Sequence, residues 1–76
     1  TSIAFDLKTA SAVTLAIYNT KGQLVRYLHK GDLEAGTNSF VWDGTDLSGR
    51  TVASGIYLYR LDLGAQSYSR KMLLMK

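Results

Sequence analysis

The chain of 76 residues contains no cysteine and only one histidine. Without cysteine no disulfide can stabilise so short a chain, which must therefore fold by packing alone. A cysteine nucleophile is excluded, and one histidine cannot supply the several His or Cys ligands of a zinc site. We expect His29 to be a solvated loop residue, because the polar, glycine-containing stretch 29–36 predicts a connection. No acid, base and nucleophile converge in the sequence, which predicts that the chain is not an enzyme and needs no cofactor or metal.

Long apolar runs and clusters of basic residues are missing too. No apolar run is longer than four residues, as in 72–75, which is far shorter than the ~18 residues that span a bilayer, so no membrane insertion is expected. The net charge is +3, but the basic residues are scattered, which argues against nucleic-acid binding. The chain starts with Thr1 and shows no signal peptide, so we interpret it as a fragment of a longer protein.

The apolar residues that are present recur with a period of two. This alternation runs through residues 2–7, 13–18, 38–43 and 56–63, and it is typical of half-buried strands. Glycine-containing turns separate the runs, and a short strand is expected at 51–53 between Gly49 and Gly55. The pattern predicts an all-β fold, a seven-stranded antiparallel β-sandwich that forms a single domain over residues 1–76.

The inward positions of these strands predict the core. We expect it to contain Phe5, Val13, Leu15, Ile17, Val25, Leu28, Phe40, Trp42, Tyr57, Tyr59, Leu61, Met72 and Leu74.

Three groups of residues are candidates for binding, each with a structural alternative. Asp43 and Asp46 could belong to a weak calcium site, but their spacing favours turns in which the carboxylates bind nearby backbone N–H groups. The outward tyrosines Tyr18, Tyr27 and Tyr68 could stack on a glycan, which we consider unlikely to be their role. Finally, if one face of the last strand is exposed, Leu73 and Met75 form a small apolar docking patch.

Several motifs resemble two related groups of domains. They are Trp42-Asp43-Gly44, Gly49-Arg50, the run from Ala53 to Tyr57, and the ending from Lys71 to Lys76. Together they look like the immunoglobulin-like domain named after the flagellar hook-capping protein, and like the C-terminal sorting domain of proteins exported by the type IX secretion system. The sequence departs from many relatives in having Glu34 and Thr51 where those carry proline.

The resemblance implies an immunoglobulin-like sandwich and an appendage without catalytic activity. We expect a sorting domain at the C-terminus of a larger exported protein, secreted or at the cell surface, whose partners are the secretion machinery and the upstream passenger domain. Alternatives are an accessory module packed beside a catalytic domain, or a carbohydrate-binding module. The motif match implies that Trp42, Asp43 and Gly44 are structural. It makes recognition candidates of Gly55, Tyr57, Lys71, Met72, Leu73, Leu74, Met75 and Lys76.

Overall fold

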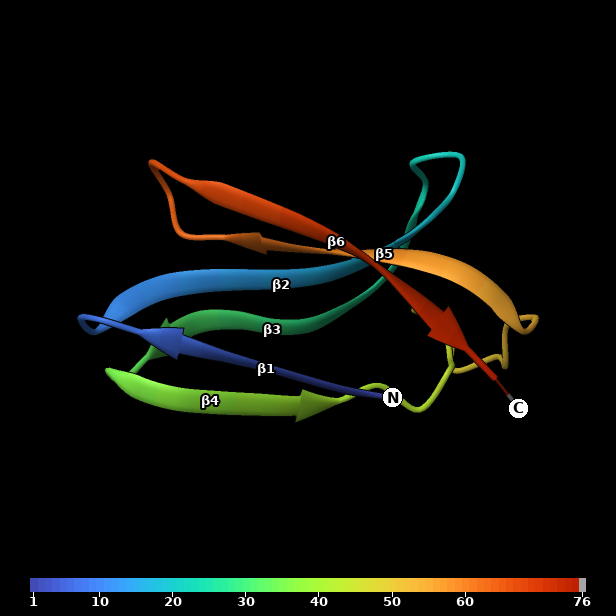
Figure 1. Cartoon of the computed structure of the whole chain (residues 1–76). Helices are drawn as coiled ribbons and strands as arrows, with labels where there is room; N and C mark the ends of the chain where they lie inside the picture. Colours follow the sequence, from blue (N-terminus) through green and yellow to red (C-terminus); the bar gives the residue numbers. More distant parts are fainter. Residues whose placement is uncertain (76) are drawn as a thin grey trace.

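A computed structural model describes residues 1–75, which form six β-strands and two antiparallel sheets (Figure 1). The larger sheet has the strand order β3-β2-β5-β6, and the smaller one pairs β1 with β4. The prediction of an all-β, antiparallel fold is confirmed. The strands are β1 (Ser2–Leu7), β2 (Ser11–Asn19), β3 (Leu24–Leu33), β4 (Gly36–Val41), β5 (Gly55–Asp62) and β6 (Ser67–Leu74).

The prediction of seven strands is wrong, because the segment 51–53 does not form one. It contributes a single antiparallel bridge between Thr45 and Thr51, and the N–H of Val52 donates to the carbonyl of Gly44 at 2.9 Å. The backbone between Gly49 and Gly55 therefore closes the preceding loop instead of extending a sheet.

The polar stretch after residue 28 is also not a loop as expected. It continues β3 to Leu33, because its backbone pairs with β2 from Leu15↔His29 to Ser11↔Leu33. Backbone pairing with a neighbouring strand does not depend on side-chain polarity, so composition misled the prediction.

The core is shared by both sheets. Its centre is β2, where Val13, Leu15 and Ile17 are at most 2% exposed. Tyr57 and Leu61 of β5 and Leu74 of β6 join them. Val25 of β3 and Trp42, which follows β4, complete this group, and all of these residues were predicted to lie in the core. The remaining predicted residues are only partly buried and pack against this core: Phe5, Leu28, Phe40, Tyr59 and Met72.

The small sheet contributes more to the core than predicted. Ile3 and Leu7 of β1 are buried, whereas Phe5 between them is half-buried. All three lie on the same face of the strand, so the missing residues could have been found from the alternation alone. No helix in the described part of the chain is long and apolar enough to span a membrane.

Candidate functional site

The loop that follows β4 is folded around a buried tryptophan. The side chain of Trp42 is 1% exposed, and its indole Nε1–H donates to the carbonyl of Thr45 at 2.9 Å. The ring of Tyr57 meets it edge-on, with centroids 5.0 Å apart and planes at 71°. The Tyr57 hydroxyl donates to the carbonyl of Ala53 at 2.6 Å, which ties β5 to the segment before it. We call residues 42–51, with Arg26 and Tyr57, the Trp42 corner.

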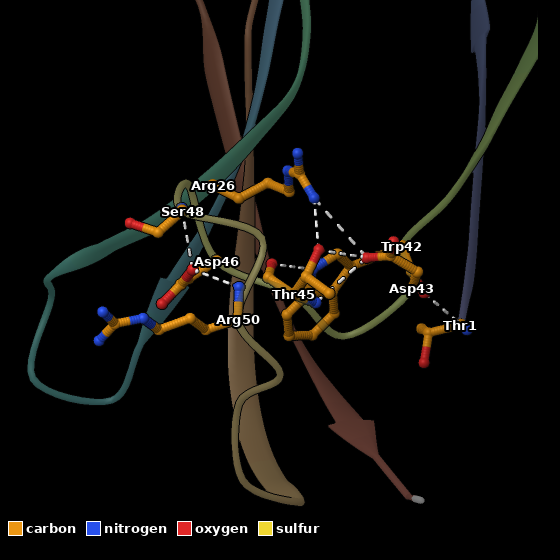
Figure 2. Close-up of polar contacts among 8 residues, drawn as sticks. All are labelled: Thr1, Arg26, Trp42, Asp43, Thr45, Asp46, Ser48 and Arg50. Carbon is orange, nitrogen blue, oxygen red and sulfur yellow. Dashed lines mark hydrogen bonds and ion pairs between the residues drawn. The ribbon is translucent and has the colours of Figure 1, made fainter.

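The polar side chains of this corner bind one another (Figure 2). One carboxylate oxygen of Asp43, Oδ1, accepts hydrogen bonds from the backbone N–H of Thr45 at 3.1 Å and from its hydroxyl at 2.6 Å. The guanidinium of Arg26 donates to the same hydroxyl and lies 3.7 Å from the carboxylate. The hydrogen bond from the Thr45 hydroxyl has the largest effect on the pKa of Asp43 and lowers it. Desolvation raises the pKa against this, and the backbone N–H of Thr45 and the charge of Arg26 lower it further, so that the net shift is downward. This carboxylate is therefore ionised at neutral pH and is engaged by Thr45 and Arg26.

A second acidic side chain organises the tip of the loop (Figure 2). Asp46 Oδ1 accepts from the backbone N–H groups of Ser48 at 2.9 Å and Arg50 at 3.0 Å. The predicted turns at Asp43 and Asp46 are thus confirmed. Within residues 1–75 no group of three or more His, Cys, Asp or Glu side chains is placed to hold a metal ion. The loop carboxylates serve the loop's own N–H groups, which supports the structural interpretation over the calcium alternative.

The corner also fixes the beginning of β1. The N–H of Trp42 donates to the carbonyl of Thr1 at 2.8 Å, and the amino group of Thr1 donates to the carbonyl of Trp42 at 3.2 Å. In the other sheet, the N–H of Leu47 donates to the carbonyl of Val25 at 2.9 Å. The Trp42 corner therefore joins the two sheets at one end of the molecule.

The predicted recognition residues of β5 and β6 separate onto two faces. Gly55 pairs with Leu74 and Tyr57 with Met72, and the side chains of Tyr57 and Leu74 are buried in the core. On the opposite face Lys71 and Leu73 (58%) are exposed, and Met75, which directly follows the strand, is 78% exposed. Of the alternatives left open for the last strand, the structure shows the one in which an apolar face is exposed. Lys76 lies outside the described residues.

Ile56 belongs to the same exposed face, although it was not among the predicted site residues. It pairs directly with Leu73 and is 52% exposed. Alternation along β5 could have found it, since Ile56 must point away from the core if Tyr57 points into it. We call Ile56, Leu73 and Met75 the β5–β6 outer patch.

Comparison with known proteins shows what this arrangement belongs to. The family model described as the FlgD Ig-like domain matches residues 1–67. The chain belongs to the FlgD Ig-like domain family. The basal-body rod modification protein FlgD of Salmonella typhimurium is 44% identical over 48 residues, which are 63% of this chain and 21% of that protein. The FlgD of Escherichia coli K12 is 42% identical over 50 residues, covering 66% of this chain and 22% of that protein.

A solved structure agrees with this assignment. The crystal structure of FlgD from Pseudomonas aeruginosa superposes with a TM-score of 0.70 at 29% identity, and the match covers 96% of this chain and 58% of that one. The chain spans about a fifth of the length of the curated relatives that it matches.

The expectation of a type IX sorting domain is therefore wrong. The relatives are flagellar FlgD proteins, so the expected partners, the type IX secretion machinery and an upstream passenger domain, are overturned with it. The alternatives of an accessory module beside a catalytic domain and of a carbohydrate-binding module fit these relatives no better. The error has a structural cause: Trp42 and Tyr57 hold the corner together, so the motif that contains them reports on the fold and not on the partner.

The outward tyrosines of this FlgD Ig-like domain do not form one platform. Tyr18 and Tyr27 line a shallow groove on the outer face of the large sheet, where the ammonium of Lys30 lies 5.1 Å from the centre of the Tyr27 ring. Tyr68 lines a different groove, between β1 and the β5–β6 pair. A glycan could not stack on all three at once.

His29 is placed on a strand and not in a solvated loop. It is half-buried on β3, with its ring centroid 5.2 Å from that of Phe40, and its Nε2 lies 3.2 Å from the carbonyl oxygen of Gly31. Its contacts are those of a packing residue at the margin of the core.

Proposed function

We propose that this FlgD Ig-like domain is a rigid, non-catalytic module of a flagellar assembly protein. The observation that carries the proposal is the family match over residues 1–67, together with curated relatives named basal-body rod modification protein. The Trp42 corner supports a non-catalytic role, because both of its carboxylates are engaged by backbone and threonine donors of the same loop. We further propose that the two sheets form an immunoglobulin-like sandwich and that the domain is one part of a longer chain.

The β5–β6 outer patch is the candidate contact surface of such a module. Ile56 and Leu73 are cross-strand partners that are both more than half exposed, and Lys71 adds a positive charge beside them. Adjacent apolar side chains on an open sheet face contribute to association by leaving water together. Three of the predicted recognition residues lie in or beside this patch: Lys71, Leu73 and Met75.

Deletion of the gene for the full-length protein in its own host tests the flagellar proposal. We expect electron micrographs of the deletion strain to show few or no complete hooks, and reintroduction of the gene to restore them. A deletion strain that builds normal hooks and filaments would show that the flagellar proposal is wrong.

Variants of the full-length protein test the contact surface separately. We expect the double substitution Ile56→Ser and Leu73→Ser to reduce hook number without lowering the melting temperature. Val41→Ser is the matched control, because Val41 is 72% exposed but lies on the small sheet. Equal hook numbers in the double variant and the control would remove the patch from the proposal and leave the flagellar role standing.

A location outside the cell or on its surface stays a prediction. Labelling of intact cells with an impermeant amine reagent, followed by recovery of the full-length protein, tests it. Labelled protein from intact cells supports this location, whereas labelling only after lysis contradicts it.

A further inference from the structure

Two positive charges lie next to each other on the outer face of the large sheet. Arg60 of β5 pairs with Ser69 of β6, and Lys71 follows two residues further along β6. Arg60 directly precedes the buried Leu61, so Arg60 and its partner point outward, and a spacing of two residues brings Lys71 to the same face. Diagonal neighbours of this kind lie ~7–8 Å apart. Both cationic side chains are exposed.

The charge of this pair is only partly compensated within the domain. Asp62 is the next outward residue of β5, on the side of Arg60 that is away from Lys71. One of its carboxylate oxygens accepts from the backbone N–H of Gly64 at 3.0 Å, and the other lies 3.9 Å from the Arg60 guanidinium. The two side chains are 41% and 49% exposed, so this ion pair is weak. Like charges side by side repel each other, and a carboxylate between Arg60 and Lys71 would relieve that repulsion.

Apolar side chains border the two cations. Leu58 pairs with Lys71 and follows Ile56 on the outer face of β5, so the β5–β6 outer patch reaches the cations without a gap. On its other side Leu58 pairs with Tyr18 of β2. Tyr18 and Arg60 both line the shallow groove on this face, which has a volume of about 270 Å³. The surface therefore offers apolar contacts and, directly beside them, two positive charges.

We propose that this surface binds an acidic segment of a partner protein, in which apolar side chains are followed by carboxylates. The proposal rests on the contact surface proposed above and names the chemistry of its partner. The apolar side chains of the segment cover the β5–β6 outer patch, and its carboxylates lie between Arg60 and Lys71. An arginine can bind a carboxylate through two parallel N–H bonds, and a lysine adds a compact positive charge.

The number of charges favours a protein segment over an anionic membrane or a nucleic acid. Recognition of anionic lipid headgroups takes clusters of roughly four to eight Lys or Arg side chains, and nucleic acids need an extended basic patch. The outer face brings only Arg60 and Lys71 together beside the apolar patch. It also carries Asp62 and, through its pairing with the outward Ala12, Asp32. A uniformly anionic surface would be repelled by these two acids, whereas a short segment can avoid them.

Binding of defined peptides to the full-length protein tests this proposal. We expect a fluorescent peptide in which leucines are followed by glutamates to bind, as measured by fluorescence anisotropy. Replacement of its glutamates by lysines should weaken binding by roughly tenfold or more. Binding of the first peptide should also weaken as salt is added, because the screening length falls from ~10 Å at 0.1 M to ~3 Å at 1 M ionic strength.

Two double variants with the same change in net charge locate the binding site. Arg60→Gln with Lys71→Gln should weaken binding of the leucine–glutamate peptide by roughly tenfold or more. Arg70→Gln with Lys8→Gln is the matched control and should leave binding unchanged. Arg70 directly precedes Lys71 on β6 but points to the other face, and Lys8 is exposed in the turn after β1.

Melting temperatures of both double variants show whether the fold is retained. If one of them fails to fold, the single variants Lys71→Gln and Arg70→Gln repeat the comparison with two neighbouring residues of one strand. We expect only Lys71→Gln to weaken binding.

Several outcomes would overturn the proposal. One is that the leucine–glutamate peptide does not bind, or binds no better than its lysine counterpart. Another is that both double variants lose binding equally, which would show an effect of net charge alone. Tighter binding to phosphatidylserine vesicles than to the peptide would assign the face to an anionic membrane. Self-association that the substitutions at Arg60 and Lys71 abolish would assign it to a second copy. The peptide measurements do not depend on the flagellar role, which the hook counts decide.

Discussion

The two ends of the molecule treat core-facing aromatic side chains in opposite ways. At the Trp42 corner, Trp42 and Tyr57 are 1% and 8% exposed, and their polar atoms donate to the backbone carbonyls of Thr45 and Ala53. At the groove between β1 and the β5–β6 pair, Tyr68 pairs with the buried Leu61 and faces the same side of the large sheet, but it is 54% exposed. The residue types are alike, so the difference is made by what lies above them: a folded loop at one end and, among residues 1–75, no further strand at the other.

Removal of the corner's tryptophan should have the largest effect. Trp42→Ala leaves a cavity at the junction of both sheets, and we expect a loss of about 3–5 kcal/mol in unfolding free energy. Hydrogen exchange of the β2 and β5 amides in the full-length protein measures this loss. Trp42→Phe, which keeps an aromatic ring but not the bond to Thr45, should retain part of the stability. If Trp42→Ala cost no more than Tyr68→Ala, the contrast between the two ends would be wrong.

The turn at the tip of the corner has a close copy outside it, which allows a matched comparison. Asn19 Oδ1 accepts from the N–H groups of Lys21 and Gln23, just as Asp46 Oδ1 accepts from those of Ser48 and Arg50. Each turn ends in a glycine with a φ of +81°, a conformation that favours glycine.

Substitution by alanine should lower the unfolding free energy more at Asp46 than at Asn19. We expect Asp46→Ala to cost ~1.5–3 kcal/mol, because its acceptor is charged, and Asn19→Ala ~0.5–1.5 kcal/mol, because its acceptor is neutral. Hydrogen exchange of the β2 and β5 amides measures both losses in unfolding free energy. Asp46→Asn should recover only part of the loss, since it keeps the acceptor but removes the charge. Equal costs for the two alanine variants would show that the charge adds nothing.

Protonation of Asp43 at acid pH should lower the stability of the Trp42 corner. The pKa of this carboxyl is below its ordinary value of 3.8 in the folded protein, so its ionised form is the one that stabilises the fold. Its contribution is complete at neutral pH and is lost as the pH falls through 3.8 towards the lower folded pKa. We expect Asp43→Asn to flatten the decline in exchange protection below about pH 5, after correction for intrinsic exchange rates. An unchanged decline in the variant would assign acid sensitivity to other carboxyls.

The smallest effect is expected at the groove. Tyr68→Ser removes a ring that is more than half exposed, and whose hydroxyl donates to the side chain of Gln66 at 2.9 Å. We expect the unfolding free energy of the full-length protein to change by no more than about 0.5 kcal/mol. Hydrogen exchange of the β2 and β5 amides measures this change, and a cost as large as that of Trp42→Ala would contradict the contrast between the two ends.

The sequence by itself determined the local features of this domain. A period of two placed the strands that carry Leu15, Ile17 and Leu61, because alternation depends only on neighbouring residues. Turn chemistry placed the bend at Asp46, since a short polar side chain binds N–H groups two and four residues on. The burial of Trp42 was also correctly predicted.

Only the tertiary structure decided which of these elements meet. The pairing of β3 with β2 made a strand of the polar stretch around His29, and the two strands of the small sheet leave Tyr68 of the four-stranded sheet more than half exposed. The pairing of Ile56 with Leu73 created an outer patch from residues that lie 17 positions apart in the chain (73 − 56 = 17). Burial and pairing are properties of distant backbone segments brought together, and no local pattern records which segment lies above which face.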